Sequence, residues 1–255
     1  MRLATFNVLH GRSPADERVD LDRFAAAVAT LDADVLALQE VDRDQPRSMN
    51  ADLTAVAAEA MGAVDSQFVA ALSGIPGGTW MAATGDEQPG AASYGIALLS
   101  RYPVVSWRVV RLPALPGRVP VWFRGARRPT VVSEEPRVAV AAVLDGPSGQ
   151  FTVACTHLSF VPYWNAVQLR RLLRSLAGTR EPLVLLGDLN MEPRKAARVS
   201  GLRPLASAAT FPHDEPTRQL DHVLVRGRLT ATGPAEAVRL PLSDHRALVV
   251  DVAAG

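Results

Sequence analysis

The stretch LVLLGDLN, residues 183–190, places four consecutive apolar residues directly before a glycine, an aspartate and an asparagine. A short apolar run of this kind is typical of a buried strand. Asp188 and Asn190 therefore follow the strand end, either as turn residues or as members of a functional site. The same arrangement, an apolar strand with a polar side chain at its end, recurs along the chain.

Polar side chains adjoin five further strand-like runs. They are Asn7 after residues 3–6, Glu40 after 35–39, His157 after 153–156, Asp221 before 222–225, and Asp244 with His245 before 247–250. Each of them taken singly can be a cap or turn residue. Taken together, they form a set of carboxylates, amides and imidazoles that strand ends can bring to one rim.

Helical patterns lie between some of these strands. Asp20 can cap a helix over residues 21–31, a second pattern over 51–61 stops at Gly62, and a third covers 163–177. The segment DGPSG, residues 145–149, separates two β-rich runs and predicts a hairpin turn. Helices and strands alternate irregularly, so we predict a mixed α/β fold in a single domain spanning residues 1–255.

The composition excludes several classes of protein. The chain has 255 residues, of which 48% are hydrophobic and 21% charged, as in a globular protein. Its net charge of +1 provides no chain-wide attraction to nucleic acid. The single cysteine, Cys155, lies in an apolar run, which excludes an intramolecular disulfide framework and favours a buried thiol. Neither a signal peptide nor a membrane-spanning stretch is recognisable, so we expect a cytoplasmic protein without stable membrane insertion.

The types of polar side chain indicate a metal. Carboxylate and amide oxygens are hard ligands suited to Mg²⁺, with Mn²⁺ or Ca²⁺ as alternatives, and no cysteine cluster or His-x-x-x-His pattern indicates zinc. A divalent ion can neutralise a phosphate oxygen and lower the pKa of bound water. A nearby histidine, oriented by a carboxylate, can then exchange a proton.

Six short motifs occur in a characteristic order. They are TFNV at 5–8, LQEVD at 38–42, THL at 156–158, GDLN at 187–190, LDHV at 220–223 and SDH at 243–245. This series resembles the endonuclease/exonuclease/phosphatase superfamily, which includes deoxyribonuclease I, AP endonucleases, neutral sphingomyelinases and inositol polyphosphate 5-phosphatases. The resemblance implies a four-layered α/β sandwich of the deoxyribonuclease I type, with two packed mixed β-sheets flanked by helices and the active site at one edge.

The resemblance also implies the metal ligands. Glu40 matches the principal Mg²⁺ ligand, with Asn7 beside it, and Asp244 completes or shares the metal site. Asp188 and Asn190 match residues that contact the attacking water and the scissile phosphate.

Three further residues match the proton-transfer groups of this superfamily. His245, paired with Asp221, matches the catalytic imidazole. His157 matches a residue that stabilises the phosphate or protonates the leaving oxygen. Whether His245 or Asp188 takes the proton of the water stays open at this point.

Four more residues are candidates for substrate binding, each with a plain alternative. Arg137 matches a recurrent arginine that either clamps a phosphate oxygen or pairs with an acid. Arg47 either reaches a phosphate or is a solvated loop arginine. Tyr94 either lines the cleft or packs in the core, and His10 either touches the site or lies in a surface turn.

The sequence predicts a Mg²⁺-dependent phosphoesterase, with a phosphodiester as the first choice of substrate. His157 stands where exonuclease III-type AP endonucleases carry a Tyr-x-Pro-Asn pattern, so the chain resembles the Thr-His-Leu type instead. The alternatives are a divalent-metal-dependent nuclease on DNA or RNA, a phosphatase or phosphodiesterase acting on a small molecule or a phospholipid headgroup, and a catalytically inactive scaffold that binds a partner. The oligomeric state stays open.

A candidate nucleic-acid contact lies in residues 113–136, the least regular part of the chain. The Arg118–Arg128 loop combines arginines with two aromatic side chains, namely Arg118, Trp122, Phe123, Arg124, Arg127 and Arg128. Such a mixture can grip phosphates and stack on bases. The alternative is a solvated loop at the edge of a sheet.

Overall fold

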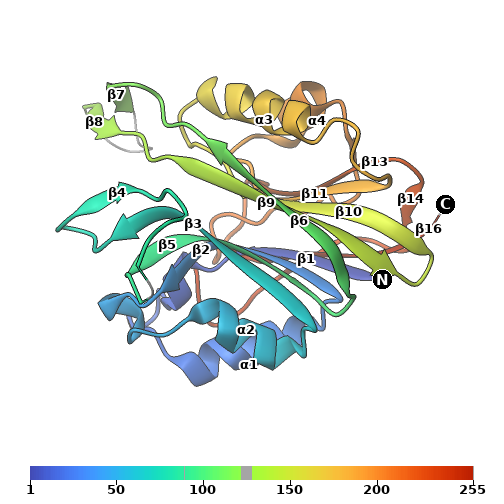
Figure 1. The fold of residues 1–255 in the computed structure, drawn as a ribbon, viewed down its shortest axis with the longest axis horizontal. Coiled ribbons are helices and arrows are strands. Elements are labelled where there is room, and N and C mark those ends of the chain that lie inside the picture. Colours follow the sequence, from blue (N-terminus) through green and yellow to red (C-terminus); the bar gives the residue numbers. More distant parts are fainter. Residues whose placement is uncertain (89, 122–127, 255) are drawn as a thin grey trace.

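The computed structural model describes residues 1–88, 90–121 and 128–254. Two β-sheets pack face to face and one pair of helices covers the outer face of each sheet (Figure 1). This is the mixed α/β sandwich that the sequence predicts, so the expected fold class is confirmed. No helix in the described ranges has the length and hydropathy needed to cross a membrane.

The first sheet brings both ends of the chain together. Its spatial order is β14 (Leu229–Ala231), β16 (Ala247–Ala254), β1 (Arg2–Asn7), β2 (Val35–Arg43), β5 (Ser93–Ser100), β3 (Asp65–Gly74) and β4 (Trp80–Ala82), with β15 (Glu236–Val238) also paired to β16. Strands β1 and β2 are parallel, which aligns Asn7 with Gln39 at their carboxyl ends.

The second sheet places three of the candidate residues in one row. Its spatial order is β12 (Arg203–Pro204), β13 (Asp221–Arg226), β11 (Leu183–Asp188), β10 (Gly149–His157), β9 (Arg137–Gly146) and β6 (Val104–Leu112). The parallel pair β10–β11 aligns His157 with Asp188, and the antiparallel pair β11–β13 aligns Asp188 with Asp221. The predicted hairpin turn at 145–149 joins β9 to β10.

Alternation along the strands directs the candidate side chains between the sheets. In β11, Val184 and Leu186 belong to the core between the two sheets, and Asp188 continues that series at a spacing of two. The same alternation applies on the neighbouring strands. His157 comes two residues after the core residue Cys155, and Asp221 comes two residues before the core residue Val223. Burial raises the pKa of the Cys155 thiol to about 12, so this cysteine is an inert core residue as expected.

Three helices agree with the predicted patterns except at their ends, and a fourth, over Pro193–Ser200, was not predicted. Helix α1 covers Leu21–Leu31, and the Asp20 carboxylate accepts a hydrogen bond from the Arg23 N–H at 2.8 Å. Helix α2 covers Leu53–Met61, two residues shorter than predicted, because the Asp52 side chain accepts from the second and third helical N–H groups and caps the helix there. Helix α3 covers Trp164–Ser175, and α4 covers Pro193–Ser200.

The described parts of residues 113–136 are more regular than predicted. Strand β7 (Arg118–Val121) pairs with β8 (Thr130–Ser133) as a two-stranded antiparallel sheet. This hairpin projects on the same side of Figure 1 as the β3–β4 hairpin. Of the loop residues named above, Trp122, Phe123, Arg124 and Arg127 lie outside the described residues.

Gly187 is the residue of β11 that a side chain would disrupt most. Its φ is +144°, and a Cβ built there would lie 1.9 Å from the Thr156 carbonyl oxygen on β10. We expect Gly187→Ala to destabilise the protein by roughly 1–3 kcal/mol because the two strands must separate. Thermal unfolding would show this as a fall in Tm of roughly 2–12 °C. Gly233→Ala is the control, since no atom lies within 4 Å of its Cβ position; equal melting of both variants would contradict the prediction.

Candidate active site

A hydrogen bond between Asn7 and Asp188 connects the two sheets. The Asn7 Nδ2 donates to Asp188 Oδ2 at 3.2 Å and to Glu40 Oε1 at 2.9 Å. Asn7 is buried at the end of β1, where it continues the inward-facing series of Leu3 and Thr5. One amide thus connects a carboxylate of each sheet, although 181 residues separate Asn7 from Asp188.

Glu40 reaches the site because β2 contains a β-bulge. The pairing of β2 with β5 shifts between Gln39 and Val41, and Glu40 has a φ of +58°. In regular alternation Glu40 would follow Leu36 and Leu38, which face α1 and α2. The bulge turns its carboxylate toward Asn7 instead, and Val41 takes the place against the helices. This is why β2 extends to Arg43, beyond the predicted strand.

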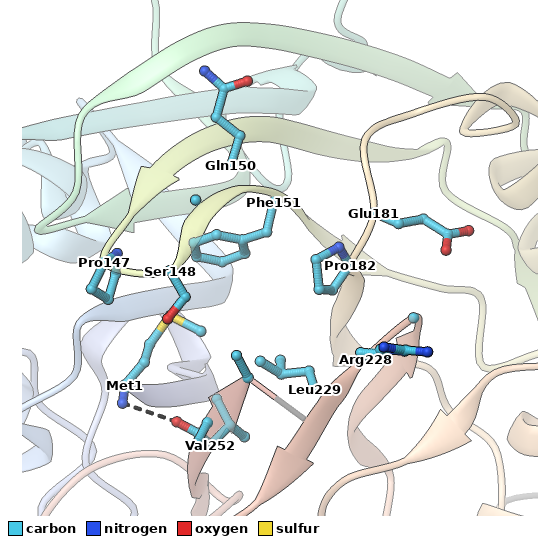
Figure 2. A pocket seen from close by; sticks show the side chains of 14 residues that line it. Met1, Pro147, Ser148, Gln150, Phe151, Glu181, Pro182, Arg228, Leu229 and Val252 are labelled. Carbon is cyan, nitrogen blue, oxygen red and sulfur yellow. Dashed lines mark hydrogen bonds between the residues drawn. The ribbon is translucent and has the colours of Figure 1, made fainter.

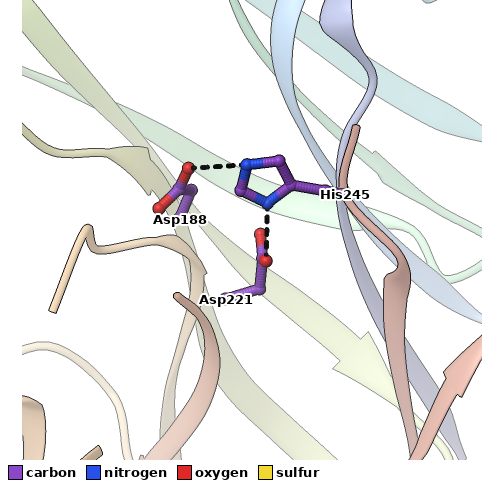
Figure 3. A group of neighbouring side chains, drawn as sticks. All are labelled: Asp188, Asp221 and His245. Atoms are coloured by element: carbon purple, nitrogen blue, oxygen red, sulfur yellow. Dashed lines mark hydrogen bonds and ion pairs between the residues drawn. The ribbon is translucent and has the colours of Figure 1, made fainter. Parts of the chain in front are cut away.

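His245 and Asp221 form a directed pair. The His245 Nδ1 lies 2.9 Å from Asp221 Oδ2, and its Nε2 faces Asp188 Oδ2 at 3.8 Å (Figure 3). Thr210 Oγ1 donates to the same Asp221 oxygen at 2.5 Å. The Phe211 ring lies 4.9 Å from the imidazole, centre to centre. These contacts fix the orientation of the imidazole, with Nε2 as the nitrogen turned to the site.

Buried charges shift the protonation of this pair. Burial lowers the pKa of His245, but the charge of Asp221 and its hydrogen bond outweigh burial, so the pKa is raised above that of an ordinary histidine. Burial and the charge of Asp221 both raise the pKa of Asp188. The surroundings therefore favour a proton on His245 or on Asp188, and the neutral imidazole forms only when that proton is lost.

His157 and Asn190 also contact Asp188. The His157 Nε2 lies 3.5 Å from Asp188 Oδ2 and 3.4 Å from Asn190 Nδ2. Burial and the charge of Arg137 lower the pKa of His157 well below its usual value, so this imidazole is neutral at pH 7. The Asn190 N–H donates to Asp188 Oδ1 at 2.9 Å, and its Nδ2 donates to the Leu158 carbonyl at 3.0 Å. A neutral imidazole and an amide thus flank Asp188.

Glu40 lies near further oxygen donors that could bind a cation. Burial and the negative charge of Asp244 raise the pKa of Glu40, which means that two carboxylates oppose each other here. The ligand atoms of Asp188, Asp221 and His245 also lie within 4.8 Å of one another, but Asp221 and His245 are already hydrogen-bonded together. Glu40 and Asp244, with the amide oxygen of Asn7, therefore offer the hard oxygen set that fits Mg²⁺, Mn²⁺ or Ca²⁺.

Two arginines lie near these carboxylates. Arg137 is buried, with its Nε 3.4 Å from Glu134 Oε1, and its charge acts on both His157 and Glu40. Arg47 makes a bidentate ion pair with the buried Asp42: its Nε donates to Oδ2 at 2.8 Å and its Nη2 to Oδ1 at 2.7 Å. Arg47 is therefore an anchored side chain rather than a solvated one.

Tyr94 and His10 adjoin this group. The Tyr94 ring centre lies 5.5 Å from the Arg47 guanidinium carbon, and burial together with the charge of Glu40 raises the tyrosine pKa. Burial and the charge of Arg47 lower the pKa of His10 to about 4, so His10 is neutral at pH 7. All four candidate substrate-binding residues thus lie on the Glu40 side of the site.

Some contributing residues carried no sequence signal. Trp80 begins the short strand β4; its ring centre is 5.8 Å from that of Tyr94, and its Nε1 donates to Glu135 Oε1 at 3.3 Å. Thr210 lies in an irregular segment without a motif, and only its bond to Asp221 reveals its part.

The site is distinct from two cavities in the described structure. One cavity of about 630 Å³ is lined by Met1, Phe151, Pro182 and Leu229, among others (Figure 2). These residues lie at or beside the starts of β1, β10, β11 and β14. The candidate catalytic residues lie at the opposite ends of β1, β10 and β11, so this cavity is not part of the site. A second cavity of about 640 Å³, lined by Phe68 and Arg111 among others, contains no candidate residue either.

The comparisons with known proteins agree on the fold. A structure described as an endonuclease/exonuclease/phosphatase from Beutenbergia cavernae is 25% identical, with a TM-score of 0.71, covering 100% of this chain and 72% of that one. Two others are the mannosyl-6-phosphatase Bt3783 of Bacteroides thetaiotaomicron (16% identity, TM-score 0.67, 99% of both chains) and sphingomyelinase C of Streptomyces griseocarneus (17%, 0.62, 98% of both chains). No curated protein sequence matches the chain.

The family assignment rests on almost the whole chain. The sequence profile of the Endonuclease/Exonuclease/phosphatase family matches residues 4–245, a range that includes each candidate site residue from Asn7 to His245. The expected enzyme class, a phosphoric ester hydrolase, is confirmed at the level of the family. The chain belongs to the Endonuclease/Exonuclease/phosphatase family.

Proposed function

We propose that the protein is a Mg²⁺-dependent phosphoesterase of the Thr-His-Leu type that hydrolyses a P–O bond, with a phosphodiester as its substrate. The observation that carries the proposal is the His245 Nε2, aimed at Asp188 by the Asp221 bond and lying beside the Glu40 carboxylate group. A proton-transfer group and a hard cation site at one strand edge are the two parts that such hydrolysis needs. We place this activity in the cytoplasm.

Glu40, Asp244 and Asn7 would hold the metal ion. When bound there, the ion would neutralise charge on a phosphate oxygen and lower the pKa of a coordinated water. Arg137 and Arg47 add positive charge on the same side, where a phosphate group needs it. The Asp42 bond holds Arg47 in place for this purpose.

In its neutral form, His245 receives the proton from the attacking water. Its Nδ1 stays bonded to Asp221, which stabilises the imidazolium that forms, and its Nε2 is the free nitrogen. Asp188 is the alternative acceptor because its pKa is raised. His157 and Asn190 contact the phosphate from the other side and stabilise the oxygen that leaves.

Hydrolysis of bis-p-nitrophenyl phosphate and p-nitrophenyl phosphate tests the reaction type. We expect Mg²⁺ or Mn²⁺ to support cleavage of the diester and EDTA to abolish it. Cleavage of the monoester alone would instead favour a small-molecule phosphatase. Cleavage of the diester together with DNA or RNA would favour a nuclease that uses the Arg118–Arg128 loop. The named neighbours share this fold while differing in activity, so the fold does not select among these substrates.

Metal binding itself is measurable without a substrate. At a Mg²⁺ concentration 100 times its Kd, we expect stabilisation by about 2.7 kcal/mol. For a protein of this size, that corresponds to a rise in Tm of roughly 5–11 °C. Removing the Glu40 charge with Glu40→Gln should reduce the rise. A catalytically inactive scaffold without a metal site would melt at the same temperature with Mg²⁺ and with EDTA.

A further inference from the structure

The two helical layers of the sandwich carry opposite charges. Helices α1 and α2 with their capping residues contain five acidic residues and one basic residue. Helices α3 and α4 with their capping residues contain six basic residues and one acidic residue. The net charge of +1 therefore hides a strong asymmetry between two outer faces that lie on opposite sides of the molecule (Figure 1).

Exposed arginines of the second layer lie on two helices that pack side by side. We call it the cationic face; it consists of Arg170, Arg171 and Arg174 on α3 and Arg194 and Arg198 on α4. The spacings of three and four residues place the members of each helix on one side of that helix. Helices α3 and α4 pack against each other, which joins the two groups.

No carboxylate neutralises the cationic face among the residues that the structure describes. None of its five arginines makes an ion pair there, whereas Arg2, Arg23, Arg43 and Arg101 on the other side of the molecule all do. The acids within residues 160–200 are used elsewhere: Glu181 pairs with Arg226, Glu192 with Arg218, and Asp188 lies in the candidate active site. Five arginines are thus left to attract an external anion.

Apolar side chains are exposed at the end of the cationic face where α3 begins. Tyr163 is 83% exposed and Val167 43% exposed, one helical turn apart, and Arg170 and Arg171 follow at the next turn. The Tyr163 ring lies 5.7 Å from the Lys195 Nζ on α4. An exposed aliphatic residue gains nothing from a phosphate backbone, whereas tyrosine and valine both gain from entering the headgroup region of a bilayer.

We propose that the cationic face docks on the surface of an anionic phospholipid bilayer, with Tyr163 and Val167 entering the headgroup layer. Arginines near such a surface each add to the attraction, and the cytoplasmic leaflet supplies the negative charge. Helix α3 starts seven residues after His157, and α4 starts three residues after Asn190. Docking therefore brings the edge of the candidate active site close to the headgroups, although the docking itself does not depend on the proposed hydrolysis.

Co-sedimentation of the full chain with vesicles tests the docking. Wild type should bind phosphatidylcholine vesicles that contain phosphatidylserine, should bind pure phosphatidylcholine vesicles far less, and should be released by salt. The double variant Arg171→Glu/Arg198→Glu should lose at least about tenfold in affinity, because two attractive charges become repulsive. Tyr163→Ser should weaken the binding that remains at high salt.

The matched control is Arg18→Glu/Arg228→Glu. Both arginines are exposed, belong to no ion pair of the described chain and lie outside the cationic face, so the net charge changes by the same amount. This control should bind vesicles within about twofold of wild type. Thermal unfolding of both variants confirms that each is folded, and hydrolysis of a soluble diester should be unchanged in both.

Three results would overturn the docking. The first is equal binding of wild type to vesicles with and without phosphatidylserine. The second is an equal loss of vesicle binding in the two double variants. The third is retention of a single-stranded oligonucleotide that Arg171→Glu/Arg198→Glu abolishes, with no vesicle binding by wild type, which would assign the face to nucleic acid. Failure of diester hydrolysis with normal vesicle binding would refute the proposed function and leave the docking intact.

Discussion

Glu40→Gln is expected to lower the Mg²⁺-dependent hydrolysis of bis-p-nitrophenyl phosphate by at least roughly 100-fold, since even the outer partners of metal ligands cost 10–100-fold when they are removed. Glutamine retains the size of the side chain and can still accept the Asn7 hydrogen bond. It removes the charge that opposes Asp244 and attracts the cation. The loss should therefore appear in catalysis and metal binding rather than in folding.

The measurement compares initial rates over a range of Mg²⁺ concentrations, together with thermal unfolding in EDTA. Glu59→Gln is the matched control, because Glu59 is an exposed residue of α2, remote from the strand ends that form the site. It should hydrolyse the diester at the wild-type rate. Full activity of Glu40→Gln at saturating Mg²⁺ would remove Glu40 from the metal site.

His245→Ala is expected to reduce kcat by roughly 10²–10⁴-fold, the usual contribution of a positioned proton-transfer group. The substitution leaves Asp221 buried with Thr210 as its remaining side-chain partner, so some loss of thermal stability should accompany it. A role in proton transfer predicts that KM changes little. It also predicts that added imidazole restores part of the activity, because a free base can occupy the space of the missing ring.

Two neighbouring variants separate chemistry from structure. Asp221→Asn should lower kcat strongly because it alters the partner that orients the His245 Nδ1 and stabilises its charge. Thr210→Val should lower kcat less, since Thr210 acts on His245 through its bond to the Asp221 oxygen. A change confined to KM in His245→Ala, without rescue by imidazole, would make His245 a substrate-binding residue instead.

Local sequence signals were strongest along regular strands. The run at 183–186, followed by Asp188, predicted both a buried strand and a polar end, and β11 ends at Asp188. The cap of α1 at Asp20 and the end of α2 at Gly62 were also predictable, because both depend on interactions within one helical turn. These features need no information from distant parts of the chain.

The direction of the Glu40 side chain could not be predicted from its local sequence. Its motif marked it as a candidate, but alternation along β2 would direct its side chain toward α1 and α2. Only the pairing of β2 with β5 creates the bulge that redirects the carboxylate to Asn7. A register shift of this kind depends on the partner strand, which the sequence of β2 alone does not contain.

The sequence by itself determined that polar side chains follow the strands, and that their types suit a hard cation and proton transfer. The reason is that strand periodicity and ligand chemistry are properties of neighbouring residues. The tertiary structure decided which atoms meet: Asn7 with Asp188, Thr210 with Asp221, and the five arginines of α3 and α4 on one unpaired face. These contacts join residues far apart in the chain, so they are set by sheet register and helix packing, which exist only once the whole chain has folded.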